Sequence, residues 1–264
     1  MTGPDGRSPG QPLEETASRS WITPDWTAQP GIRALTTTRA GGVSQGVYQG
    51  LNLAEHVGDD PASVAENRRR LISGSGCRSI QWLNQVHGVQ VLRARPGLNR
   101  AIPEADGLWT DEPGIGIAVL TADCLPVVIA AQAAGVVAVA HAGWRGLIAG
   151  VLEATLAELP CTAADCVAWL GPAIGPRAYE VGDDVATAVA GLGSMAQRSL
   201  SPGCRPGKYW LDLFALARQR LLGAGVAEVF SQQICTFASP ELYSYRRDGL
   251  TGRMATLAWL EPRA

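Results

Sequence analysis

Short apolar runs, of strand length rather than helix length, are separated by polar and glycine-rich positions over most of the chain. Residues 136–140 form a β-branched run, and residues 115–119 and 127–130 flank a polar turn that contains Asp123 and Cys124. Such runs predict buried strands, because a strand covered on both faces needs apolar side chains at successive positions. The predicted strands are residues 32–38, 115–119, 127–130, 136–140, 167–170 and 254–260.

Stretches with a helical repeat alternate with these runs. Asp60 and Pro61 are typical of an N-cap and a first helical position, so they predict the start of a helix. A stripe of apolar residues over 147–159 predicts a second helix that Pro160 ends, and a third is expected to begin near Asp212. Because strands and helices mix throughout, the pattern predicts an α/β or α+β fold with a mixed sheet.

The composition is that of a globular protein with a substantial core. The chain has 264 residues, of which 46% are hydrophobic and 17% are charged. Residues 1–20 are rich in Gly, Pro, Ser and Glu, and they predict a disordered tail. From Trp21 onward no composition break divides the chain. We therefore expect a single catalytic domain over residues 21–264.

Charge and cysteine content exclude several classes of function. A net charge of −2 and an isoelectric point near 5.9 provide no basic surface for nucleic acid. No apolar stretch approaches the roughly 18 uninterrupted residues of a membrane span, and the N-terminus lacks the pattern of a secretory signal. The six cysteines do not resemble a disulfide framework in a chain of this length. We expect a cytoplasmic protein that binds neither nucleic acid nor membranes.

Two of the three histidines and one cysteine occupy short, turn-like strings, and Cys124 and His141 each lie beside a predicted strand. His87 precedes a glycine, Cys124 lies in a turn, and His141 ends the apolar run before it. Their gaps are too long for a structural zinc finger, but they suit three ligands on separate elements with a fourth position open, as in catalytic zinc sites. A turn histidine, a small buried cysteine and a surface histidine are the plainer interpretations, and His56 is the least favoured ligand.

Two chemistries fit these side chains. A thiolate and two neutral imidazoles hold zinc and leave one position for a water molecule that the metal activates. Without metal, Cys124 would be a hydrolase nucleophile with one histidine as its base. Zinc is favoured because the hydrolase scheme gives the second histidine no role. Copper is less favoured, since a lone site offers no route to multi-electron oxygen reduction. A metal-binding module without catalysis is the remaining interpretation.

A loop after the first predicted strand is a candidate anion site. It contains Arg39, Gly41, Gly42 and Ser44, so it offers a guanidinium, a hydroxyl and backbone N–H groups to a phosphate. An ordinary turn with a solvated arginine explains the same string equally well. Residues 244–249 predict a tight turn, for which a structural role and closure over a site are both open.

Several of these strings, in order along the chain, resemble the YfiH family, also called the laccase-domain or peptidoglycan-editing-factor family. Jointly they are specific, they extend from about residue 33 to residue 260, and no motif position departs from the family pattern. The matching strings are residues 37–44, 51–53 with 56–60, 84–88, 105–107, 121–126, 141–146, 171–175, and 245–249 with 251–253.

The resemblance implies an α+β fold, with one compact domain of mixed β-sheets flanked by helices and related in architecture to bacterial cysteine-dependent toxin deamidases. It also implies a zinc site whose ligands map onto His87, Cys124 and His141. These three residues are therefore the predicted catalytic and metal-binding set, with Arg39 and Ser44 predicted to bind phosphate. Asp106 and Asp123 are candidates for proton transfer.

Three activities are associated with the family. Members are described as purine nucleoside enzymes that phosphorolyse adenosine, inosine, guanosine and methylthioadenosine and that deaminate adenosine. They are also described as copper polyphenol oxidases, and as editors of wrongly built peptidoglycan precursors. We predict the first activity, with zinc as the cofactor and with a purine nucleoside and phosphate as the small-molecule partners.

Overall fold

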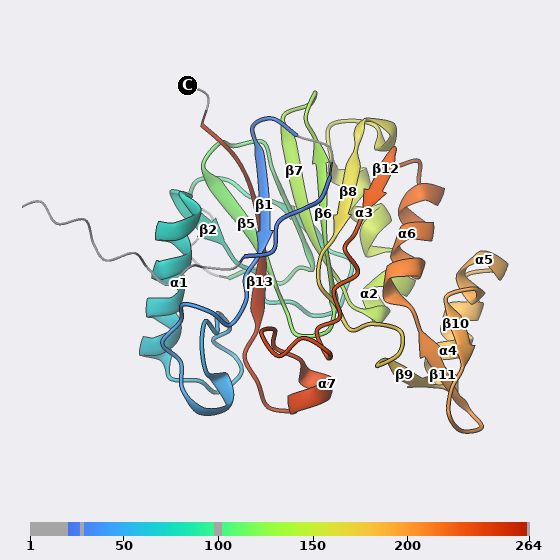
Figure 1. The fold of residues 1–264 in the computed structure, drawn as a ribbon. Helices are drawn as coiled ribbons and strands as arrows, with labels where there is room; N and C mark the ends of the chain where they lie inside the picture. Colours follow the sequence, from blue (N-terminus) through green and yellow to red (C-terminus); the bar gives the residue numbers. More distant parts are fainter. Residues whose placement is uncertain (1–20, 27–28, 98–101, 263–264) are drawn as a thin grey trace, which may run out of the picture.

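Two β-sheets lie face to face at the centre of the protein (Figure 1), whose computed structural model describes residues 21–26, 29–97 and 102–262. The predicted disordered tail, residues 1–20, lies outside this range. The four-stranded sheet has the order β1 (Ile32–Thr36), β13 (Met254–Leu260), β5 (Ile115–Thr121) and β2 (Ser79–Gln81). The six-stranded sheet has the order β12 (Glu228–Phe230), β8 (Val167–Leu170), β6 (Leu125–Ala131), β7 (Val136–Ala142), β4 (Gly107–Thr110) and β3 (Val91–Arg93).

Both of these sheets are mixed. In the larger sheet, β8, β6, β7 and β4 pair in antiparallel fashion, whereas the outermost strands β12 and β3 run parallel to their neighbours. In the smaller sheet, β13 is antiparallel to both β1 and β5, and β2 is parallel to β5. Mixed sheets with helices on their outer faces make an α+β fold, as predicted.

The strand pattern is almost purely apolar because each sheet is covered on both faces. Along β6 and β7, Val128 and Val139 point into the layer between the sheets, where they meet Ile117 and Val119 of β5. The alternate positions of β6 and β7 point outward into a second core under the helices, because successive side chains of a strand alternate between its faces. This double burial explains why the sequence shows continuous apolar runs instead of an apolar–polar alternation.

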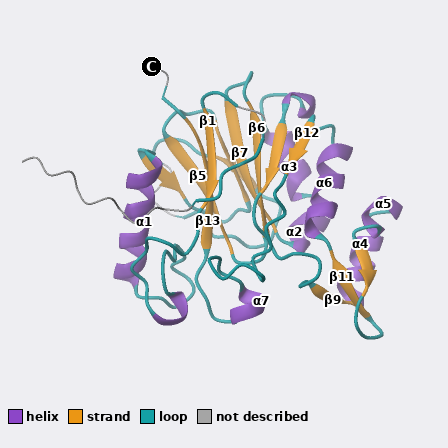
Figure 2. Ribbon diagram, viewed as in Figure 1, coloured by secondary structure: helices purple, strands orange, loops and turns teal. Residues whose placement is uncertain are grey.

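Helices cover the outer face of each sheet (Figure 2). Helix α1 (Pro61–Ser75) packs Leu71 against the four-stranded sheet. The six-stranded sheet is covered by α2 (Trp144–Ala149), α3 (Val151–Glu158) and α6 (Leu213–Gly223). No helix within the described ranges is long and apolar enough to cross a membrane. The remaining elements are α4 (Asp183–Ala190), α5 (Ser194–Gln197), α7 (Tyr245–Asp248) and a small sheet of β10 (Leu200–Pro202), β11 (Lys208–Leu211) and β9 (Glu180–Gly182).

Most of the predicted elements are present, with one correction. Strands β8 and β13 have the predicted bounds, and the Asp60 side chain caps α1 by accepting hydrogen bonds from two backbone N–H groups. The helix predicted over residues 147–159 is two helices, because Gly150 has a left-handed conformation with φ of 98° that ends α2 and begins α3. Strands β2, β3, β4 and β12, the small sheet, α4 and α5 were not predicted.

The topology brings the end of β5, the start of β6 and the end of β7 to one edge of the sandwich. Strand β5 turns directly into β6, and Pro126 near the start of β6 pairs with His141 near the end of β7. On β5 and β7, every second side chain faces the layer between the sheets, and Thr121 and His141 occupy such positions. These two positions therefore lie where that apolar layer ends.

Candidate functional site

The predicted trio converges at this edge. The donor atoms of His87, Cys124 and His141 all lie within 4.8 Å of one another. Cys124 Sγ is 3.8 Å from His87 Nε2, and the two imidazole rings meet edge to face with centroids 4.7 Å apart. Within the described residues this is the one group of three or more His, Cys, Asp or Glu side chains that could hold a metal ion.

A buried carboxylate, Asp106, shapes the loop that carries His87. The backbone N–H groups of Val86, His87 and Gly88 donate to it at 3.2, 3.0 and 2.7 Å. His87 itself adopts a positive φ of 59°, a conformation that is uncommon for a residue with a side chain. Three converging hydrogen bonds stabilise this turn and direct the imidazole toward Cys124.

The same carboxylate orients the second imidazole. Asp106 Oδ1 lies 2.8 Å from His141 Nδ1, and the backbone N–H of His141 donates to the Asp106 carbonyl at 2.7 Å. His141 is only 3% exposed, so solvent does not compete for this hydrogen bond. With Nδ1 held in this way, Nε2 is free to coordinate, as in the carboxylate–histidine–metal arrangement of many metalloenzymes.

Hydrogen bonds from three other segments stabilise the turn that presents Cys124. Asp123, which precedes it, has a positive φ of 95°. The Asp123 carboxylate accepts hydrogen bonds from the Thr236 hydroxyl and the Arg246 N–H, each at 2.6 Å, and its carbonyl accepts from the Ile174 N–H at 2.9 Å. This network maintains a backbone conformation that is unfavourable for aspartate alone, so the position of the thiol is determined before any ligand binds.

Close packing at Gly143 explains one further position of the motif. A Cβ atom there would lie 3.0 Å from His87 Cδ2 and 3.1 Å from Cys124 Sγ. A side chain at this position would displace the imidazole or the thiol by a few tenths of an ångström. Gly143, two residues after His141, therefore allows the trio to pack closely.

Charge is shared between the thiol and one imidazole. Burial raises the pKa of Cys124, but the adjacent His141 and His87 outweigh it and lower the value to about 6. Burial lowers the pKa of His141, but the Cys124 thiolate and the Asp106 carboxylate outweigh it and raise the value to about 9. With no cation between them, the two groups are a thiolate and an imidazolium at pH 7.

The donor set fits a metal ion. Bonds of about 2.3 Å to sulfur and about 2.0 Å to nitrogen in a tetrahedral site separate the two donors by about 3.5 Å. Cys124 Sγ and His87 Nε2 are 3.8 Å apart, and all three donor atoms lie within 4.8 Å of one another, so small side-chain movements would complete the site. Two imidazoles and one thiolate suit zinc or copper. Three protein ligands would leave a fourth position open toward the adjoining cavity.

A cavity of about 370 Å³ adjoins the trio. It is mostly apolar, and its polar and aromatic side chains come from segments far apart in the sequence. Besides the trio, those side chains include His56, Thr121, Tyr179, Tyr245, Arg246 and Arg253. The predicted turn at 244–249 thus contributes two residues of the wall, and it forms the short helix α7 with Ser244 as its N-cap. Tyr179 and Arg253 were not predicted as site residues.

The structure does not bring Arg39 and Ser44 to this cavity. They line a separate surface hollow together with Glu241. The Ser44 hydroxyl donates to Asp59 at 2.6 Å and accepts from the Asn67 amide at 2.9 Å, so it is engaged within the protein. The loop predicted to bind an anion therefore holds a buried polar network away from the trio.

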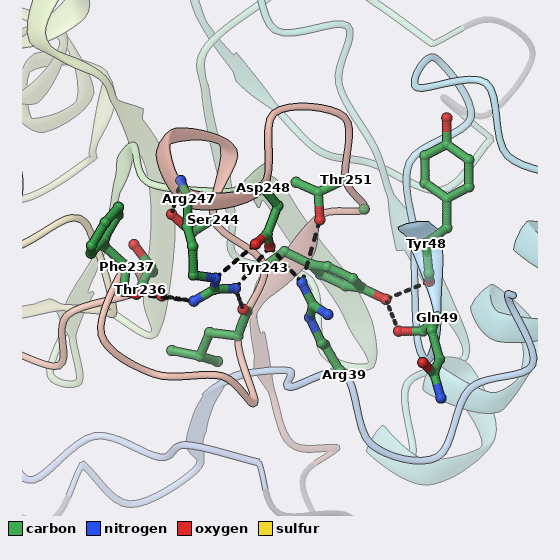
Figure 3. A network of polar contacts seen from close by, with 12 residues as sticks. Arg39, Tyr48, Gln49, Thr236, Phe237, Tyr243, Ser244, Arg247, Asp248 and Thr251 are labelled. Atoms are coloured by element: carbon green, nitrogen blue, oxygen red, sulfur yellow. Dashed lines mark hydrogen bonds and ion pairs between the residues drawn. The ribbon is translucent and has the colours of Figure 1, made fainter. Parts of the chain in front are cut away.

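Arg39 takes part in a network that holds α7 in place (Figure 3). Its guanidinium donates to Asp248 at 2.7 Å and lies over the Tyr243 ring at 4.5 Å from the centroid. Asp248 also pairs with Arg247 at 2.8 Å. The Arg247 guanidinium in turn donates to four backbone carbonyls, those of Thr236, Phe237, Ser239 and Leu242. The network thus stabilises the segment that places Tyr245 and Arg246 at the cavity.

Comparison with known proteins assigns the family. A family model described as multi-copper polyphenol oxidoreductase laccase matches residues 33–261. A protein of Escherichia coli strain K12 named purine nucleoside phosphorylase YfiH is 46% identical over 241 residues, which cover 90% of this chain and 98% of that protein. The chain belongs to the YfiH family. The resemblance inferred from the motifs is confirmed.

Other members of the YfiH family agree in sequence and in fold. A Pseudomonas aeruginosa protein named purine nucleoside phosphorylase is 47% identical over 243 residues, covering 92% of this chain and 99% of that protein. A crystal structure of a Neisseria meningitidis protein of family DUF152 superposes with a TM-score of 0.88 at 44% identity, covering 92% of this chain and 100% of that one. The predicted fold, mixed α+β in one domain, is confirmed.

Proposed function

We propose that this protein is a zinc-dependent purine nucleoside phosphorylase that also deaminates adenosine. The observation that carries the proposal is the convergence of His87, Cys124 and His141 in the lining of one cavity. The names of the Escherichia coli and Pseudomonas aeruginosa relatives supply the substrate class. The cavity has the size and the mixed apolar and polar lining of a small-molecule site.

Aromatic and cationic side chains of the cavity suit the two parts of the substrate. The rings of Tyr179 and Tyr245 provide flat surfaces for a purine base. Arg246 and Arg253 provide the positive charge for phosphate and replace Arg39 and Ser44 as the proposed anion site. Arg253 Nη1 donates to the Thr251 carbonyl at 2.7 Å, which fixes one edge of its guanidinium.

Phosphorolysis transfers the ribosyl group from the base to phosphate. A phosphate oxygen bonds to C1′ as the glycosidic bond breaks, and the purine leaves with the bonding electrons and takes a proton. The products are ribose 1-phosphate and the free base. Arg246 and Arg253 would hold the phosphate against C1′, while the aromatic walls hold the base and exclude water. A zinc ion held by the trio supplies a Lewis acid at the cavity wall.

Proton transfer in either reaction needs a free titratable group. Asp106 and Asp123, the two candidates from the sequence, are each occupied by several hydrogen bonds and act as positioning groups. His56 lines the cavity outside the trio, and burial, assisted by Arg253 and Arg68, lowers its pKa. A neutral imidazole at pH 7 can accept a proton, so His56 is our candidate for this role.

A cysteine hydrolase is the second candidate function, and one observation favours it. The lowered pKa of Cys124 beside two imidazoles is what a thiolate nucleophile requires. A multi-copper oxidase is less well supported, because the described residues contain one metal-binding group where multi-electron oxygen reduction needs several coppers. A metal-binding module without catalysis predicts no turnover of any nucleoside.

Product analysis tests the proposed function. Metal-quantified protein is incubated with adenosine, with and without phosphate, and adenine, inosine and hypoxanthine are separated. We expect adenine only when phosphate is present, and inosine in both cases. Adenine that forms without phosphate would indicate hydrolysis instead of phosphorolysis, and the absence of all three products would rule out the function.

A further inference from the structure

The Thr121 hydroxyl is a buried polar group without a partner inside the protein. Thr121 is 1% exposed, and its Oγ1 atom makes no hydrogen bond within the described structure. The residue lines the cavity beside the trio. An unsatisfied buried hydroxyl costs folding free energy, so its presence requires an explanation.

Other buried threonines show what an ordinary structural role looks like. The hydroxyls of Thr36 and Thr256 lie 2.7 Å apart across the β1–β13 pair. The Thr155 hydroxyl donates to the Val151 carbonyl at 2.7 Å, within α3. Each of these hydroxyls is satisfied by the protein, whereas that of Thr121 is not.

Its position in the fold gives the hydroxyl a place at the site. Thr121 is the last residue of β5 and directly precedes the turn that presents Cys124. Ile117 and Val119 of β5 face the layer between the sheets, and Thr121 is the next position on the same face of the strand. His141 has the corresponding position near the end of β7. The Thr121 side chain therefore lies where the apolar layer gives way to the cavity.

We propose that Thr121 is a substrate-contacting residue, whose hydroxyl makes its missing hydrogen bond to the nucleoside bound beside His87, Cys124 and His141. The inference rests on the proposed function for the nature of the substrate. A ribose hydroxyl and a purine ring nitrogen are both suitable partners, because a threonine hydroxyl can donate and accept. The free protein keeps an unsatisfied group that the bound substrate satisfies.

Thr121→Val tests this assignment, because valine preserves the shape of the side chain and removes the hydroxyl. The expected result is a decrease of about tenfold in kcat/KM for inosine, the size expected for one lost hydrogen bond to substrate. Zinc content is expected to be unchanged and Tm equal or higher, because an unsatisfied polar group has been removed. Thr121→Ser is expected to restore most of the activity.

Thr256→Val is the matched control on the neighbouring strand. It leaves the Thr36 hydroxyl without its partner, so we expect a lower Tm and an unchanged kcat/KM. If Thr121→Val lowers Tm as Thr256→Val does and leaves kcat/KM unchanged, the hydroxyl is structural and the proposal is wrong.

Inosine binding, measured by calorimetry in the wild type and in the same variants, distinguishes a failure of the Thr121 contact from a failure of the proposed function. Binding that weakens in Thr121→Val without any turnover by the wild type would support the contact and reject the phosphorylase activity. Turnover that Thr121→Val leaves unchanged would reject the contact alone. Neither binding nor turnover in the wild type would reject both.

Discussion

Asp106 is the residue on which the arrangement of both imidazoles depends. Its side chain is fully buried and receives the N–H groups of the His87 loop together with the ring N–H of His141. Burial raises its pKa, but the bonds from His141 and from the Gly88 and Val86 N–H groups outweigh it, so the net pKa is lowered and the carboxylate stays ionised. One buried charge thus orients two side chains from different parts of the chain.

We expect Asp106→Asn to weaken zinc binding by about 10- to 100-fold, as loss of a partner behind a metal-bound histidine does. The amide NH₂ group would face the N–H groups of Val86 and Gly88 if it took the place of Oδ2, or the His87 N–H and the His141 ring if it took the place of Oδ1, so the His87 loop would have to move. Competition with a chromophoric chelator measures the affinity. Asp111→Asn, at the far end of β4 where Asp111 pairs with Arg93, is the control. Equal affinity in both variants would contradict the role of Asp106.

Cys124 has a different reactivity in the zinc and nucleophile mechanisms. We expect about one zinc per chain in purified protein, and its loss in Cys124→Ala with the fold retained. In a Cys204→Ala background, which removes the exposed cysteine, iodoacetamide should modify Cys124 slowly until zinc is stripped and rapidly afterwards, because the metal-free thiol has a lowered pKa. Elemental analysis and mass spectrometry measure the two effects. Full zinc occupancy in Cys124→Ala would reject the ligand assignment.

At the scale of elements, α7 is the part of the cavity wall that depends most on distant contacts. It has four residues, so its own hydrogen bonds stabilise it little. Arg39 after β1 and Arg247 within α7 share Asp248, and Arg247 holds the preceding loop through its carbonyls. The positions of Tyr245 and Arg246 therefore depend on an arginine that does not line the cavity.

Arg39→Lys is expected to raise KM for nucleoside and phosphate together by a few fold, with zinc content unchanged. Lysine cannot reproduce both the ion pair with Asp248 and the stacking on Tyr243, so α7 would lose support. Arg246→Lys should instead raise KM for phosphate most strongly. Steady-state kinetics with each substrate varied in turn distinguish the two. Arg33→Lys, on β1 with an exposed partner in Glu261, is the control. A selective effect of Arg39→Lys on phosphate would return the anion site to Arg39.

Elements with strong apolar patterns could be predicted from the sequence, and weakly patterned ones could not. The central strands β5, β6 and β7 are buried along their whole length, so their runs are visible without any partner. The short outer strands β3 and β12 are partly exposed and were not predicted. Strands β9, β10 and β11 have three or four residues, mostly partly exposed, and Pro202 lies in one of them. The division between α2 and α3 required knowing that Gly150 adopts a left-handed conformation.

The same distinction applies to the site: residues in distinctive strings could be predicted, and residues that only the fold brings together could not. The trio could be predicted, because histidine is rare in this chain and the strings around His87 and His141 are distinctive. Tyr179 and Arg253 could not be assigned, because only the fold brings their segments to the same cavity. The ion pair of Arg39 with Asp248 could not be predicted from the local pattern, because the two residues are far apart in the sequence.

For the molecule as a whole, the site lies where two apolar layers end. The sheets bury the interiors of β5, β6 and β7, and polar side chains appear only at the shared edge of these strands. His141 lies near the end of β7 and Cys124 in the connection from β5 to β6, whereas His87 lies in a loop between β2 and β3. Loops and α7 supply much of the remaining cavity lining, among them His56, Tyr179 and Tyr245.

Metal removal and replacement test the central claim, that zinc held by His87, Cys124 and His141 is needed for turnover of purine nucleosides. Protein of known zinc content is assayed with inosine and phosphate as purified, after chelation, and after reloading with zinc or with copper. We expect ribose 1-phosphate formation to disappear with the metal and to return with zinc in proportion to occupancy. Full activity in metal-free protein, or recovery with copper alone, would contradict it.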